Sequence, residues 1–200
     1  MKSILLAFFI LIPIGYTIAQ EFAKQTEAFR AEYKSEFLKS ERSPLKKKDL
    51  QYLRFYEADS SYRVTATFEK SEKSEPFEMP TYSGIKKTYV QYGILTFELL
   101  GVKQTLNVYK SLGLQALPQY KDYLFLPFKD KTNGKESYGG GRYIDLTTKD
   151  IKDNVYILDF NKCYNPYCAY SNGYNCPIPP KVNHLAVAIE AGEKNFGREH

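Results

Sequence analysis

The fold is decided by the stretch Thr88-Tyr-Val-Gln-Tyr-Gly-Ile-Leu-Thr-Phe-Glu-Leu-Leu-Gly-Val-Lys-Gln-Thr-Leu-Asn-Val-Tyr109. Apolar and polar residues alternate along it, and β-branched and aromatic side chains are frequent, which is typical of strands buried on one face. Glycine weakens a strand interior and often marks a turn, so Gly93 and Gly101 are expected to divide the stretch. We predict three strands here, at residues 88–92, 94–100 and 102–109.

Further short strands are predicted on both sides of this stretch. Residues 123–128 are almost entirely apolar, which is typical of a central strand. Asn133-Gly134 is a strong hairpin turn signal between this strand and the next. The remaining predicted strands are residues 62–69, 77–80, 143–146, 155–160 and 185–189.

Two helices are predicted before the strands. Aromatic residues recur at helical spacing across residues 21–40 with charged residues between them, which predicts one amphipathic helix. Ser43-Pro44 is typical of an N-cap followed by proline in the first turn, and predicts a short helix through Leu53. The sequence thus predicts a mainly β (α+β) fold, in which an antiparallel sheet, curled into a barrel or sandwich, follows one long and one short N-terminal helix.

The first 19 residues have the pattern of a secretory signal peptide. Lys2 precedes an apolar run from Ile4 to Ile14, and Thr17-Ile-Ala19 places small residues before the expected cleavage site. The run is shorter than the roughly 20 residues that span a bilayer, so we expect no stable membrane insertion after cleavage. The remaining residues, 20–200, are expected to form a single β-rich domain in the bacterial periplasm or outside the cell.

The charge of the chain argues against nucleic-acid binding. The formal net charge is +5, with 28 lysines and arginines against 23 aspartates and glutamates. The basic residues are scattered, apart from a short run at residues 46–48, whereas a nucleic-acid binder usually concentrates them on one face. We interpret the excess as an ordinary solvated surface.

The strongest candidate for a site is the segment Tyr138-Gly-Gly-Gly-Arg-Tyr-Ile-Asp145. Three glycines can offer backbone N–H groups to an anion, and an arginine can bind a carboxylate or phosphate with two parallel hydrogen bonds. The alternative is structural: a tight turn, with the arginine paired to a nearby carboxylate. The residues assigned to a candidate ligand site are Gly139, Gly140, Gly141, Arg142, Asp145, Asp159, Asn161 and Glu190.

Acidic residues at predicted strand ends allow a second chemistry. Two of Asp130, Asp145, Asp159 and Glu190 could share a proton in general acid–base catalysis or bind a hard cation such as calcium. The alternative is that these carboxylates are solvated or paired with basic residues. No metal site and no cofactor is predicted from them.

The three cysteines lie close together in the last third of the chain. Cys168 and Cys176 are eight residues apart in an irregular loop, which in an exported protein favours a disulfide. The alternative is a zinc site in which Cys163 and His184 join them as ligands. A thiol nucleophile is less favoured, because the other histidine, His200, is the last residue.

Several long motifs resemble the bacterial domain-of-unknown-function family 1684. They include Pro127-Phe-Lys-Asp130, the segment 138–146, Tyr164-Asn-Pro-Tyr-Cys-Ala169, Cys176-Pro-Ile-Pro-Pro180 and Ile189-Glu-Ala-Gly-Glu193. The resemblance runs through most of the chain after residue 19. It implies no particular activity, since the family has no established one. The family usually has alanine at the position of Cys163, so any role of that thiol would be specific to this protein.

The function expected from these patterns is the binding of a small polar or anionic ligand at the region 139–159. Arg142 should then border a cavity partly walled by tyrosine rings, with Asp145 and Asp159 orienting its guanidinium. One alternative is a hydrolase that uses Asp145, Asp159 or Glu190 with Arg142 as the charge stabiliser. Another is a cell-envelope interaction module whose tyrosine-rich loop is the contact surface. The sequence does not indicate the oligomeric state.

Overall fold

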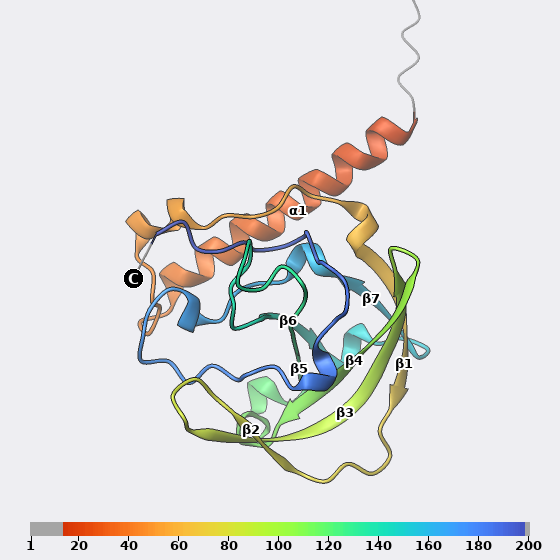
Figure 1. The fold of residues 1–200 in the computed structure, drawn as a ribbon, viewed down its shortest axis with the longest axis vertical. Coiled ribbons are helices and arrows are strands. Elements are labelled where there is room, and N and C mark those ends of the chain that lie inside the picture. The colour runs from red at the N-terminus through yellow and green to blue at the C-terminus, as the bar shows by residue number, and fades with distance from the viewer. Residues whose placement is uncertain (1–13, 199–200) are drawn as a thin grey trace, which may run out of the picture.

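A computed structural model describes residues 14–198 of the chain. Most of the predicted signal peptide, residues 1–13, lies outside the described residues. Helix α1 (Ile14–Lys39) follows, so the predicted amphipathic helix is present and begins earlier than residue 21. Figure 1 shows α1 lying across one side of a strongly curved sheet. None of the helices within residues 14–198 combines the length and apolar character needed to cross a membrane.

The sheet is antiparallel and curls into an open half-barrel (Figure 1), which confirms the predicted fold class. The order of its strands is β6-β5-β4-β3-β1-β7, and β2 pairs with β3. The strands are β1 (Arg63–Lys70), β2 (Phe77–Pro80), β3 (Lys86–Leu99), β4 (Val102–Ser111), β5 (Tyr123–Phe128), β6 (Arg142–Thr147) and β7 (Val155–Asp159). The end strands β6 and β7 do not pair with each other, which leaves one side of the barrel open.

Short helices connect these elements. The predicted second helix is a 3-10 helix, η1 (Lys47–Tyr52), that starts at Lys47 instead of after Ser43-Pro44. The Ser43 hydroxyl accepts a hydrogen bond from the Leu45 backbone N–H at 3.2 Å, which closes a local turn and delays the helix. The other short helices are η2 (Ser60–Tyr62), α2 (Leu112–Gln115), η3 (Pro118–Tyr120), η4 (Thr148–Asp150), η5 (Phe160–Lys162), η6 (Tyr167–Ala169) and η7 (Lys181–Asn183).

Two strand predictions need correction. Gly93 does not end a strand: β3 continues through it with a bulge between Gln91 and Gly93. A Cβ at position 93 would lie 2.4 Å from the Phe68 ring, so glycine is required there for close packing. Residues 185–189 form no strand, because their backbone groups make hydrogen bonds with the connection between β5 and β6. The Leu185 N–H, for example, donates to the Lys129 carbonyl at 2.8 Å.

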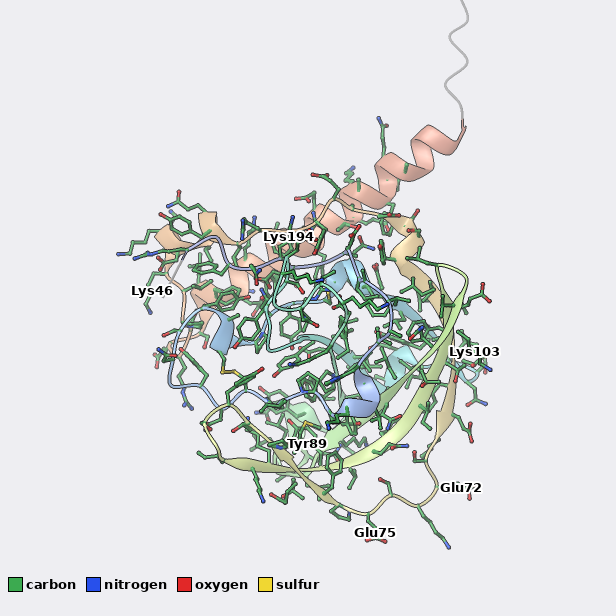
Figure 2. The ribbon with its side chains drawn as sticks, in the orientation of Figure 1. Lys46, Glu72, Glu75, Tyr89, Lys103 and Lys194 are labelled. Carbon is green, nitrogen blue, oxygen red and sulfur yellow. A yellow bond between two sulfur atoms is a disulfide. The ribbon has the colours of Figure 1, made fainter. Side chains whose placement is uncertain are left out.

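Both faces of the β5–β6 pair carry clusters of apolar or aromatic side chains. Leu124 and Ile144 point into the main apolar core inside the half-barrel. Because side chains alternate along a strand, Phe125 and Tyr143 lie on the opposite face, in a second, aromatic cluster that Tyr89 of β3 joins. Figure 2 shows Tyr89 beside the sheet interior, whereas Glu72 and Glu75 project outward. Asp145 is paired with Phe125 in the register, so it lies on the aromatic face.

Candidate functional site

Arg142 is fully buried and binds only protein groups. Its Nη2 donates to Asp130 Oδ2 at 2.8 Å and to the Ile189 carbonyl at 2.7 Å, and its Nη1 donates to the Ala191 carbonyl at 2.6 Å. The guanidinium therefore ties β6 to the segment 189–193. The prediction that Arg142 borders a cavity and binds an anion is wrong, because both terminal nitrogens are used inside the fold.

Two of the three glycines are required by close packing. Gly141 adopts φ +96°, and a Cβ there would lie 2.7 Å from the Phe128 carbonyl oxygen. A Cβ at Gly140 would clash with the Tyr138 ring and the Tyr82 hydroxyl. The Gly139 carbonyl accepts a hydrogen bond from Lys129 Nζ at 2.9 Å. The segment is thus a close-packed turn that leads into the buried arginine.

Glu193 was not predicted and is the second buried charge centre. Its Oε1 accepts from the Tyr170 hydroxyl at 2.6 Å, and its Oε2 accepts from the Tyr33 hydroxyl at 3.0 Å and the Asn165 N–H at 2.9 Å. Burial raises the pKa of Glu193 to about 7, although these hydrogen bonds partly oppose the shift. Because Tyr33 belongs to α1, this carboxyl group anchors the helix to the domain.

The cysteines form the predicted disulfide. Cys168 and Cys176 are bonded, with Cα atoms 6.2 Å apart, so neither is available as a zinc ligand. Cys163 is a free, buried thiol, and burial raises its pKa to about 12. A thiol held in its protonated form does not suit a nucleophile or a metal ligand.

A cavity of about 1120 Å³ lies where the half-barrel is open, between β6, β7, helix α1 and the disulfide loop. Its wall is rich in aromatic rings contributed by segments far apart in the sequence. The tyrosines on this wall include Tyr33, Tyr89, Tyr123, Tyr143, Tyr156 and Tyr164. No sequence pattern marks this wall, because it forms only when helix, sheet and loop assemble.

Asp145 lies on the wall of this cavity and is exposed to it. Its Oδ1 accepts a hydrogen bond from the Tyr123 hydroxyl at 2.7 Å. Although the side chain faces open space, the surrounding protein removes much of its hydration, which raises the pKa of Asp145. The carboxylate in an otherwise apolar strand segment, Tyr143-Ile-Asp-Leu146, was the sequence signal for this position.

The other predicted site residues divide between the cavity and the rest of the fold. Asp159, at the end of β7, also lines the cavity, and its Oδ1 accepts from the Asn161 side chain at 2.9 Å. Asn161 itself is buried and donates to the Asp59 carbonyl at 2.8 Å, so it supports the backbone. Glu190 is exposed and is not part of the cavity wall. Only Asp145 and Asp159 of the eight candidates are brought together here.

The comparisons with known proteins agree with this fold. Residues 48–194 match the family described as "Protein of unknown function (DUF1684)". The chain is also similar to the solution NMR structure of an uncharacterized protein from gene locus rrnAC0354 of Haloarcula marismortui, with a TM-score of 0.67 and 33% identity over 89% of this chain and 96% of that one. None of the curated proteins compared with the chain matches it. The chain therefore belongs to the DUF1684 family of proteins of unknown function.

Proposed function

We propose that this protein binds a small polar ligand in the tyrosine-lined cavity, with Asp145 as the main polar contact. The observation that carries the proposal is a carboxylate kept exposed to an aromatic cavity at a cost in hydration. Ligand pockets are mostly apolar or aromatic with a few convergent polar groups, and perturbed pKa values cluster at functional sites. Arg142 is buried away from this cavity, so it does not support the binding of an anion there.

The cavity can be tested by NMR titration of the full domain with four probes: benzylamine, glucose, nicotinamide and benzoate. We expect at least one probe to shift the backbone amide signals of Asp145, Tyr123 and Tyr164 in a saturable manner, since these residues lie at one place on the wall. Signals of the exposed loop around Glu72 serve as the control. If no probe shifts the cavity signals at millimolar concentration, the proposal is overturned.

A second candidate is a hydrolase, because two carboxylates line the same cavity. The raised pKa of Asp145 suits a general acid, and the Asp159 carboxylate, held by Asn161, could act as the base. A separate assay with a cleavable probe distinguishes the two functions. Conversion of a cleavable probe such as phenyl acetate, lost in both Asp145→Asn and Asp159→Asn variants, would establish catalysis, whereas unaltered probes support binding alone.

We also propose that the protein is exported to the periplasm or beyond, with residues 1–19 removed. The apolar run and the small residues before Gln20 support this, and a Cys168–Cys176 disulfide is typical of oxidising compartments. Intact-mass measurement of the protein from its native host should give a chain that begins at Gln20 and lacks two hydrogens. A chain that retains Met1 would refute export by this route.

A further inference from the structure

We propose that the cavity selects an organic ammonium ion and places its nitrogen against the Asp145 carboxylate. This inference rests on the proposed binding function and adds the charge of the ligand to it. The ion pairs formed among residues 14–198 do not include Asp145. A desolvated carboxylate without a cationic partner is costly, and a bound cation would offset that cost.

The rings around Asp145 strengthen this preference. Tyr143 and Tyr164 stand nearly perpendicular, with an interplanar angle of 87° and centroids 5.9 Å apart. Phe125 meets Tyr143 at 76° with centroids 4.7 Å apart. Two rings at right angles form a corner of the cavity wall, and the faces of aromatic rings attract cations. Aromatic walls beside a carboxylate therefore recognise both the positive charge and the apolar part of an amine.

The basic residues of the cavity wall do not reverse this preference. Lys162 Nζ lies 5.5 Å from the centre of the Phe29 ring, and the Arg63 guanidinium carbon lies 5.9 Å from the centre of the Phe22 ring. Both cations are thus directed at α1. Burial lowers the pKa of Lys87, the basic residue contributed by β3, which weakens its cationic form. The remaining basic residue of the wall, Arg42, is exposed to solvent on the loop that follows α1. An anion bound beside Asp145 would therefore meet a carboxylate.

Three probes of similar size test the charge of the ligand: benzylamine, benzyl alcohol and benzoate, titrated into the full domain by NMR. We expect benzylamine to bind about tenfold more tightly than benzyl alcohol, a difference of about 1.4 kcal/mol. Benzoate should bind more weakly than either. In Asp145→Asn the advantage of benzylamine should fall to about twofold or less, because the charge is lost while the Tyr123 hydroxyl keeps an acceptor.

The control variant is Glu32→Gln, which removes an exposed carboxylate from the α1 side of the same cavity and should leave the preference intact. A second measurement does not depend on any variant. Lowering the pH should protonate Asp145 and weaken benzylamine binding, while benzyl alcohol binding stays constant. The other acids of the cavity wall are Glu32 and Glu36 on α1, and Asp150 and Asp159 on the sheet side. Repeating the pH titration with Glu32→Gln, Glu36→Gln, Asp150→Asn and Asp159→Asn distinguishes their protonation from that of Asp145.

The outcomes distinguish this inference from the proposal on which it rests. If benzyl alcohol or benzoate binds the cavity as tightly as benzylamine, the selection of a cation is overturned and the binding cavity stands. Equal benzylamine preference in wild type and Asp145→Asn also overturns it. If none of the probes binds, the binding function itself fails.

Discussion

Replacing Arg142 with alanine should lower the free energy of unfolding by about 3–5 kcal/mol, the usual cost of breaking a buried ion pair by removing one partner. The change would leave the Asp130 carboxylate buried without its cation. It would also remove donors from the Ile189 and Ala191 carbonyls. Urea unfolding followed by circular dichroism measures the loss, provided that the variant still folds.

The matched control is Arg198→Ala. Arg198 also pairs with an aspartate, Asp49 at 3.2 Å, but more than half of its side chain is exposed. Exposed pairs contribute about 0–1 kcal/mol, so this variant should unfold almost like wild type. Arg142→Lys keeps the charge without the fork of donors and should fall between the two alanine variants. Similar losses in Arg142→Ala and Arg198→Ala would contradict the structural role given to Arg142.

Stability should fall as the pH rises, because of Glu193. Its pKa in the folded protein is about 7, against an ordinary value of 4.5. The folded state therefore holds the proton more tightly than the unfolded chain does. The resulting stabilisation is fully present below pH 4.5 and is lost as the pH rises through 7. A shift of this size corresponds to about 3 kcal/mol at most, at 1.36 kcal/mol per pKa unit.

Glu193→Gln isolates this effect, because glutamine has similar shape and cannot ionise. Relative to wild type, the variant should gain about 2–3 kcal/mol between about pH 5 and about pH 8, while pH effects common to both proteins cancel. The groups that face the carboxyl are Tyr33 of α1, Tyr170 and the Asn165 N–H. Glu190→Gln, an exposed neighbour, should show no such trend. A stability difference for Glu193→Gln that does not change with pH would refute the assignment.

The local parts of this fold could be predicted from the sequence. Strands β2 and β5 have the predicted bounds, because alternation and turn residues act over a few positions. The prediction at Gly93 was wrong because the sequence alone does not distinguish a glycine required by a neighbouring ring, here Phe68, from a glycine in a turn. The segment 185–189 is apolar like a strand, but its hydrogen bonds go to the distant β5–β6 connection.

The candidate site was predicted only in part, because its contacts also join residues that are far apart in the sequence. Asp145 was identifiable as a carboxylate in an apolar strand. Arg142 was conspicuous as well, but its partner Asp130 and the carbonyls of 189–193 decide that it is structural, and no local pattern shows those contacts. No local pattern singles out Glu193, because its burial depends on Tyr33, which lies 160 residues earlier in the chain.

The most direct test of the binding cavity is a crystal structure of the protein grown with benzylamine. We expect density for the probe inside the cavity, with its nitrogen about 3 Å from an Asp145 carboxylate oxygen, the usual length of a charged hydrogen bond. The probe's ring should pack against Tyr143 or Tyr164. A cavity filled by the protein's own side chains, or a probe bound only elsewhere, would contradict the account.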